Sequence, residues 1–135
     1  MDTLAKRMVI RSDLKAARDV EDAVVAEVRR CGFSESTAFA VKLAMEEGIN
    51  NAIRHGNGYD PNKTVEVAYE IDAGKVVIVV TDQGQGFDPA GVPDPTIDEN
   101  IEKPSGRGIM LMRRYMDEVC FNERGNQVRM VKWNG

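Results

Sequence analysis

The feature of this sequence that most constrains its fold is a change in the spacing of its apolar residues. Between about residues 13 and 55, apolar side chains recur at three- and four-residue steps, the period of helices that pack through one face. At residues 65–71 the period becomes two, and an almost wholly apolar run comes next at 75–82, both typical of strands. Helices followed by strands predict separate helical and sheet layers, so we expect an α+β two-layer sandwich.

Turn and cap residues divide this pattern into elements. Gly32 is expected to end the first helix, Ser34 to cap the second, and the cluster at 56–58 to end the second. The predicted elements are strands at 6–12, 65–71, 75–82, 118–124 and 127–133 and helices at about 13–31, 35–55 and 106–116. Tight turns join neighbouring strands, so we expect a mostly antiparallel sheet packed against about three helices.

One segment fits no regular element. Residues 88–105 hold four of the five prolines and several acidic residues. A loop of this length is more often functional or mobile than decorative. With 135 residues in all, the chain is long enough for one core, and we expect a single domain spanning 1–135.

Charge and composition narrow the classes of partner. The formal net charge is −4 and the acidic and basic residues are interspersed, which argues against nucleic acid as the main partner. The longest apolar stretch, Val76–Val80, is too short to span a membrane, and the first residues show no signal-peptide pattern, so we expect a cytoplasmic protein. Cys31 and Cys120 lie in no metal-binding or redox spacing and are expected to be small buried side chains.

The second helix carries the first candidate site, because helical phase sorts its polar residues into two groups. At about 100° per residue, Glu46 and Asn50 fall on a wholly polar side. Glu47 and Asn51 fall on another strip, which they share with small residues and one histidine: Ala40, Ala44, Gly48 and His55. Small residues beside two polar groups leave room for a ligand. A carboxylate suits proton abstraction and an amide oxygen suits Mg²⁺, although an ordinary solvated helix face remains the alternative.

His55 is the only histidine in the chain. A lone histidine at a helix end is more typical of capping or packing than of catalysis. Because it lies on the strip with Glu47 and Asn51, we include it among the candidate nucleotide-binding residues rather than the catalytic ones.

Two glycine-rich turns complete the candidate site. Asp82, Gly84 and Gly86 come directly after the apolar run, where glycines allow a backbone to approach a ligand closely. Gly106 and Gly108 open the third helix, whose free N–H groups are a natural seat for phosphates. Neither turn matches a P-loop or a dinucleotide fingerprint, and each by itself is also compatible with a simple surface turn.

Taken together, ExxxN in MEEGINNAIRHG, DxGxG in TDQGQGFDP and GxG in SGRGIMLMRRYMDEV resemble the GHKL, or Bergerat-fold, ATPase superfamily. Within it, the chain is most similar to small bacterial anti-sigma factor serine-protein kinases. The resemblance implies a nucleotide pocket between the helices and the sheet. The three boxes occur in order over essentially the whole chain.

The resemblance also implies roles for these residues. Glu47 would be the general base, Asn51 the Mg²⁺ ligand and Asp82 the partner of the adenine amino group. The glycines Gly84 and Gly86 would shape the adenine turn, and Gly106 and Gly108 would approach the phosphates. Residues 88–105 would form a lid, and Arg107 would contact the nucleotide. Whether Lys103 or Arg107 contacts the γ-phosphate stays open.

By the same resemblance, we expect an ATP-binding serine/threonine-protein kinase that uses ATP and Mg²⁺ and acts as an anti-sigma factor or similar switch. Its partners would be a sigma factor and a STAS-domain antagonist, and it would form a homodimer. One alternative is a nucleotide-sensing module that sequesters a partner without transferring phosphate. A detached histidine-kinase domain is less favoured, because the chain lacks a dimerising hairpin with a phosphoacceptor histidine. The remaining alternative is an α+β domain that binds no nucleotide.

Overall fold

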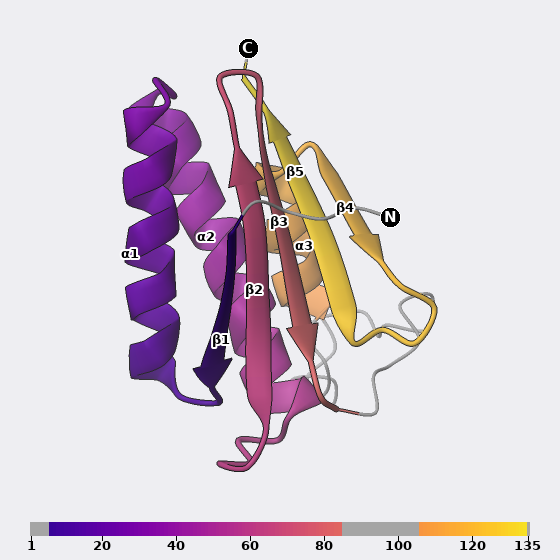
Figure 1. Ribbon diagram of the computed structural model, residues 1–135. Coiled ribbons are helices and arrows are strands. Elements are labelled where there is room, and N and C mark those ends of the chain that lie inside the picture. The colour runs from indigo at the N-terminus through magenta and orange to yellow at the C-terminus, as the bar shows by residue number, and fades with distance from the viewer. Residues whose placement is uncertain (1–5, 85–105, 135) are drawn as a thin grey trace.

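Strands with one apolar face and helices with one apolar stripe can bury both by packing as two layers, and the computed structural model has this form (Figure 1). It describes residues 6–84 and 106–134, except for the side chains of residues 106 and 107. The elements are β1 (Lys6–Arg11), α1 (Leu14–Arg30), α2 (Glu35–Asn51), η1 (Ala52–Gly56), β2 (Thr64–Ile71), β3 (Lys75–Asp82), α3 (Gly106–Tyr115), β4 (Glu118–Phe121) and β5 (Gln127–Trp133). The predicted α+β sandwich is confirmed.

The sheet of the described residues has the order β1-β2-β3-β5-β4, and every neighbouring pair is antiparallel. The almost wholly apolar strand β3 lies at its centre, between β2 and β5. Val80 faces Val67 on one side and Val128 on the other. The central position explains the apolar sequence of β3, because this strand is flanked by strands on both edges and covered by helices. Its last residue, Asp82, therefore emerges from the middle of the sheet.

Local signals set the helix boundaries as the sequence predicts. The Asp13 carboxylate caps α1 by accepting hydrogen bonds from the amides of Lys15, at 2.7 Å, and Ala16, at 3.2 Å. Ser34 Oγ caps α2 by accepting from the Thr37 amide at 3.1 Å. Between them, Gly32 has a φ of 89°, the left-handed conformation that commonly follows a helix end.

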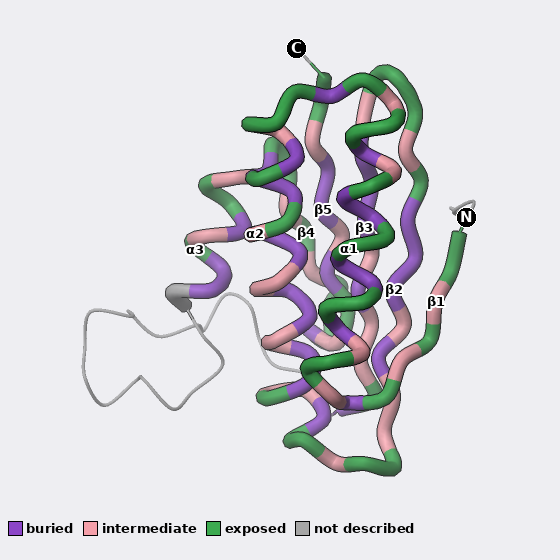
Figure 2. The backbone as a smooth tube through the Cα atoms, turned by 90° about the vertical axis from the view of Figure 1, so that its left-hand side faces the viewer, coloured by how far each residue is buried: buried purple, intermediate pink, exposed green. Residues whose placement is uncertain are grey.

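The core lies between the two layers, where Figure 2 shows the buried positions concentrated. The predicted stripe of α2 is buried, with Val41, Met45 and Ile49 each 0% exposed. Two positions of α1 differ from expectation. Leu14 is 43% exposed although it fits the apolar period, and Glu21 is only 4% exposed although it is charged.

The second helix does not end as a regular α-helix. After Asn51 it continues as the π-helical turn η1, in which the amide of Asn57 donates to the Ala52 carbonyl at 2.8 Å. A π-turn adds one residue to the hydrogen-bonded ring and shifts the helical phase of the residues after it, and such turns are frequent at functional sites. His55 and Gly56 therefore leave the phase set by α2.

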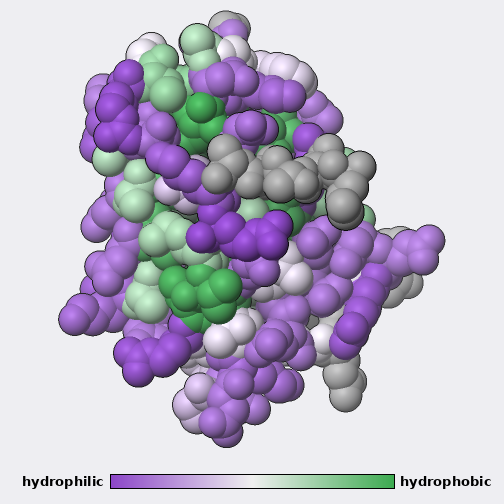
Figure 3. Space-filling view, viewed as in Figure 1, coloured by the Kyte–Doolittle hydropathy of each residue, from purple (hydrophilic) through white to green (hydrophobic). Residues whose placement is uncertain are grey.

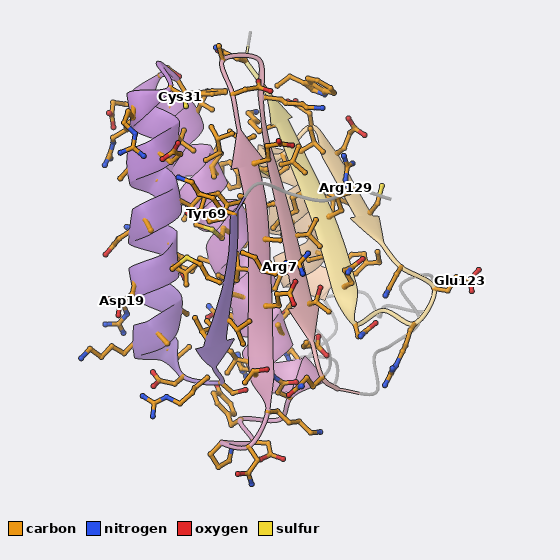
Figure 4. All side chains as sticks on the ribbon, viewed as in Figure 1. Arg7, Asp19, Cys31, Tyr69, Glu123 and Arg129 are labelled. Atoms are coloured by element: carbon orange, nitrogen blue, oxygen red, sulfur yellow. The ribbon has the colours of Figure 1, made fainter. Side chains whose placement is uncertain are left out.

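The outer face of the sheet is turned away from the helices and toward the viewer in Figures 3 and 4. Hydrophilic residues cover much of it, among them Arg7, whose Nε lies 3.0 Å from Glu66 Oε1. Cys120 is exposed and Cys31 is half-buried, so the expectation that both cysteines are small buried side chains is wrong. It lies in β4, a short strand at the edge of the sheet, opposite Arg129 of β5. Among the described residues, no helix is both long and apolar enough to cross a membrane.

Candidate functional site

A pocket is lined by the ends of several elements. These ends lie together at the lower end of the molecule in Figure 1. The empty space between its walls is about 470 Å³ and includes open solvent. The lining comes from α2, η1, β3, α3 and the β4–β5 hairpin. The lining residues are Gly48, Asn51, Ala52, His55, Gly56, Val80, Asp82, Met112, Phe121, Gly125, Asn126, Gln127 and Val128. A concave, mostly apolar site with a few polar groups at fixed positions is the usual form of a small-molecule site.

Asp82 supplies the acidic group of this pocket. Its Oδ1 accepts a hydrogen bond from the Gly84 amide at 2.8 Å. Burial raises the pKa of Asp82, while the Gly84 bond and the charges of Arg124 and Lys63 act in the opposite direction. The second carboxylate oxygen, Oδ2, takes no part in the Gly84 bond and can accept a hydrogen bond from a ligand.

Two glycines make this arrangement possible. A Cβ on Gly56 would lie 2.3 Å from Asp82 Cγ, and a Cβ on Gly84 would lie 1.8 Å from the Gly56 carbonyl oxygen. Only glycine fits at either position without displacing its neighbour. The end of η1 and the turn after β3 are thus packed backbone against backbone, as the glycine-rich sequence of both segments requires.

Glu47, Asn51 and Gly108 come together at a second point. A Cβ on Gly108 would lie 3.0 Å from Glu47 Oε2 and 3.2 Å from Asn51 Nδ2, so the first turn of α3 passes directly over these side chains. Asn51 lines the pocket as well, whereas Glu47 does not, so Asn51 connects the two regions. Burial raises the pKa of Glu47, the nearby Glu46 charge raises it further, and Arg54 lowers it.

The β4–β5 hairpin forms a wall that the sequence did not indicate. Asn126 Nδ2 donates to the Asp82 carbonyl at 3.2 Å, and the Asp82 amide donates to the Asn126 carbonyl at 2.9 Å. A guanidinium nitrogen of Arg124 donates to the Gly84 carbonyl at 2.9 Å. Gly125, which lies between Arg124 and Asn126 in the turn, has a φ of 79°. Phe121 and Val128 add apolar surface to the pocket. The only sequence signal was the expected turn at 125–126, which gives no hint of a ligand.

A second missed residue is Asn57, which is 3% exposed. Its Nδ2 donates to Ser12 Oγ and to the Thr64 carbonyl, both at 2.9 Å, and its Oδ1 accepts from the Gln83 amide at 2.9 Å. An asparagine between two glycines at a helix end indicated only a turn. Its long-range partners could not be inferred from local sequence.

The other predicted site residues divide into two groups. His55 lines the pocket, and Gly106 begins α3 next to Gly108. Gly86, the predicted lid at 88–105 and the side chain of Arg107 lie outside the described residues. Within the described part of the chain, no cluster of three or more His, Cys, Asp or Glu side chains could hold a metal ion, so Asn51 remains a candidate ligand on its own.

Fold and site together define a class: an α+β domain with a pocket between its helices and its sheet, and a partly buried aspartate in that pocket at the exit of the central strand. Comparison with known proteins agrees. The model of the histidine kinase-like ATPase domain matches residues 10–132, and the chain belongs to this family. Membership implies that the domain binds a nucleotide.

Individual relatives are more specific. An anti-sigma F factor of Geobacillus thermodenitrificans (strain NG80-2) is 36% identical over 90 residues, which cover 64% of this chain and 61% of that protein. The serine-protein kinase RsbW of Bacillus subtilis (strain 168) is 29% identical over 113 residues, covering 77% of this chain and 69% of the kinase. The chain thus spans less than two thirds of the Geobacillus anti-sigma factor.

A solved structure shares the fold. The crystal structure of the RsbU and RsbW domains of Rv1364c from Mycobacterium tuberculosis superimposes with a TM-score of 0.58 over 96% of this chain and 32% of that one. At 16% identity, this likeness supports the fold alone. The resemblance to GHKL ATPases, and among them to anti-sigma factor kinases, is confirmed by the family match and the named relatives.

Proposed function

We propose that this protein is an ATP-dependent serine/threonine-protein kinase that acts as an anti-sigma factor and phosphorylates a STAS-type antagonist protein. The observation that carries the proposal is the placement of Glu47, Asn51 and Gly108 together beside a pocket that also contains the partly buried Asp82. Such a site has an acceptor for a nucleotide base at one end and a carboxylate with an amide at the other. The names of the relatives supply the class of reaction and partner.

The pocket end of the site fits adenine. Asp82 has one carboxylate oxygen engaged by Gly84, and its other oxygen can accept from an exocyclic amino group. Apolar side chains from three elements, Val80, Met112 and Val128, line the same space and would contact a flat ring. One polar acceptor within an apolar pocket gives a ligand a fixed orientation.

The other end fits phosphates. The ten-residue helix α3 begins at Gly106, and its early N–H groups carry the positive end of the helix dipole. Because residue 108 is glycine, no side chain separates the backbone of α3 from Asn51, and a Cβ at this position would lie 3.2 Å from Asn51 Nδ2. The amide oxygen of Asn51 would hold Mg²⁺, which when bound neutralises phosphate charge.

Glu47 would act as the general base. The acceptor serine or threonine hydroxyl gives its proton to the Glu47 carboxylate as its oxygen bonds to the γ-phosphorus, and the bond from that phosphorus to the ADP oxygen breaks. The raised pKa of Glu47 makes it a stronger base than an ordinary carboxylate. The helix positions it on the opposite side of Asn51 from the adenine end.

The partners are inferred from the names of the relatives and from the site. We place a sigma factor and a STAS-domain antagonist as alternative partners in the cytoplasm, with the protein acting as a homodimer. The bound nucleotide, ATP or ADP, would decide between them. The proposal treats residues 1–135 as one ATPase domain, in which residues 88–105 serve as the lid and Arg107 contacts the nucleotide.

Replacing Glu47 by Gln tests the base. We expect phosphotransfer to a STAS-domain substrate to fall by about 10²- to 10⁴-fold, the usual contribution of general base catalysis, while the affinity for Mg²⁺-ATP stays close to wild type. Transfer of ³²P from labelled ATP and equilibrium dialysis measure the two quantities.

Glu46→Gln is the matched control, because Glu46 is the adjacent carboxylate with the same ExxxN spacing. This variant is expected to keep transfer at neutral pH. The acidic limb of its pH–rate profile should move to lower pH, because removal of the Glu46 charge lowers the pKa of Glu47. Full activity in Glu47→Gln would exclude this residue as the base. If the wild-type protein binds ATP tightly but transfers no phosphate, the result would favour the alternative function of a nucleotide-sensing module that sequesters a partner.

A further inference from the structure

The side chain of Asn57 joins its own segment to three others, two of which are distant in the sequence. It lies just after η1 and bonds Ser12 between β1 and α1, the carbonyl of Thr64 at the start of β2, and the amide of Gln83 beyond β3. Ser12 Oγ in turn donates to the Lys63 carbonyl at 2.8 Å. Both N–H groups of the Asn57 amide and its oxygen are used at 2.9 Å, in a position that is 3% exposed.

One of these bonds reaches the nucleotide site directly. Gln83 lies between Asp82, the pocket carboxylate, and Gly84, whose amide holds that carboxylate at 2.8 Å. The Gln83 side chain is anchored to the same region, because its Oε1 accepts from the Thr64 amide at 2.8 Å. Asn57 therefore fixes the backbone of the turn that orients Asp82.

The preceding residue closes the contact from the other side. Gly56, next to Asn57, lies against the Asp82 carboxylate, and its carbonyl oxygen lies against Gly84. The two glycine backbones are in direct contact, but neither glycine has a side chain that would stop the turn from sliding past Gly56. The hydrogen bond from the Gln83 amide to Asn57 opposes such a movement, together with the bond from Arg124 to the Gly84 carbonyl, and a shift of the turn would redirect the Asp82 carboxylate.

We infer that Asn57 is a positioning residue for base recognition: it holds the Asp82–Gly84 turn against Gly56 and thereby fixes the preference of the pocket for adenine. This inference rests on the proposed function, since it assumes that Asp82 receives the amino group of the base. It assigns Asn57 no contact with the nucleotide. The effect is on selectivity, because a misdirected carboxylate loses its advantage for an amino group over a carbonyl group.

The experiment compares ATP with inosine triphosphate, which carries a carbonyl in place of the adenine amino group. Dissociation constants for both nucleotides are measured by titration calorimetry in the wild-type protein, Asn57→Ala, Ser12→Ala and Asp82→Asn. We expect the wild type to prefer ATP and Asp82→Asn to lose that preference. In Asn57→Ala the dissociation constant for inosine triphosphate divided by that for ATP should fall by about tenfold, equivalent to about 1.4 kcal/mol.

Ser12→Ala is the matched control. It removes one partner of the Asn57 side chain but leaves the bond between Asn57 and Gln83 intact. It should lower stability and leave the ATP-to-inosine-triphosphate ratio near wild type, which separates positioning of the turn from general support of the fold. An equal loss of selectivity in Ser12→Ala would contradict a specific role for Asn57.

If Asn57→Ala does not fold in buffer, the same titrations are made with an osmolyte that favours the folded state, and with Asn57→Ser, which can replace at most one of the bonds. A wild-type ratio in either folded variant would overturn the inference. A wild-type protein that binds neither nucleotide would overturn the proposed function instead, so the two failures are distinguishable.

Discussion

At the scale of single residues, Glu21 is a charged side chain on the buried face of α1. It is 4% exposed. Burial is the main cause that raises its pKa from 4.5 to about 7, and the Glu46 charge on α2 adds to the effect. Lys42 on α2 and Arg18 on α1 lower the pKa but do not offset the burial. Near neutral pH, the folded protein therefore holds a proton here that the unfolded chain has already released.

This difference makes stability depend on pH. A carboxyl group with a raised pKa favours the folded state least when it is ionised, so the free energy of unfolding should fall as pH rises from 4.5 to about 7 and level off above that. Glu21→Gln removes the free-energy cost of an ionised carboxylate at this buried position. We expect it to be more stable than wild type at pH 8, by on the order of 3 kcal/mol for the full shift, and nearly equal at pH 4.5.

Urea unfolding at pH 5, 6, 7 and 8 measures the effect. Asp22→Asn is the control, because Asp22 is the exposed neighbour on the same helix. Its pH dependence should be close to that of the wild type but slightly weaker, because the Asp22 charge contributes less than burial to the raised pKa of Glu21. A Glu21→Gln variant that is less stable than wild type at pH 8 would show that the carboxylate makes a net favourable interaction at that position.

At the scale of elements, the helix formed by α2 and η1 contains two glycines in different surroundings. A Cβ on Gly48 would meet Met130 Cε at 3.2 Å, the flexible end of a long side chain. A Cβ on Gly56 would lie 2.3 Å from Asp82 Cγ, in a short side chain held by the Gly84 amide. The first contact can be relieved by a rotation of methionine, and the second requires the turn to move.

Alanine substitutions should separate the two. Gly56→Ala is expected to lose about 1–3 kcal/mol of stability through overpacking. Gly48→Ala should change stability little, because the gain of roughly 0.5–1 kcal/mol from replacing glycine inside a helix offsets the tighter contact. Urea denaturation of both variants measures the difference. Equal stability of the two would mean that the Asp82 side chain moves aside at little cost.

The sequence was most informative for elements with strong local signals. The cap at Ser34, the glycine at 32 and the change of period made the fold predictable, because each acts within a few residues. Helical phase also grouped Asn51 with Glu47, and in the structure both lie beside Gly108, with Asn51 lining the pocket. The turn of Asp82 and Gly84 was indicated by its glycines.

The features that the sequence missed depend on contacts between distant segments. Asn57 meets Ser12 across 45 positions, and Arg124 meets Gly84 across 40, so no local pattern marks either pair. The period of apolar residues likewise cannot reveal Glu21, since a charged residue on the buried face breaks the pattern instead of extending it. The π-turn after Asn51 has the sequence of an ordinary helix end, so its change of phase was not predictable.

At the scale of the whole molecule, the site joins both layers, since its walls come from η1, α2 and α3 on one side and from β3 and the β4–β5 hairpin on the other. A ligand held by all of these segments binds the folded state and has no equivalent site in the unfolded chain. Its binding must therefore raise the free energy of unfolding. At one hundred times its dissociation constant, the gain is about 2.7 kcal/mol.

Thermal unfolding with and without Mg²⁺-ATP measures this linkage. We expect the midpoint to rise by several degrees and to keep rising with the logarithm of nucleotide concentration, as mass action requires. Asp82→Asn is the matched control, because it keeps the shape of the pocket but removes the carboxylate acceptor, and its midpoint should rise much less. Mg²⁺ alone should have little effect, since Asn51 offers one amide oxygen and the described residues contain no acidic cluster around it. A midpoint that does not move at millimolar nucleotide would mean that the two layers do not form a nucleotide site.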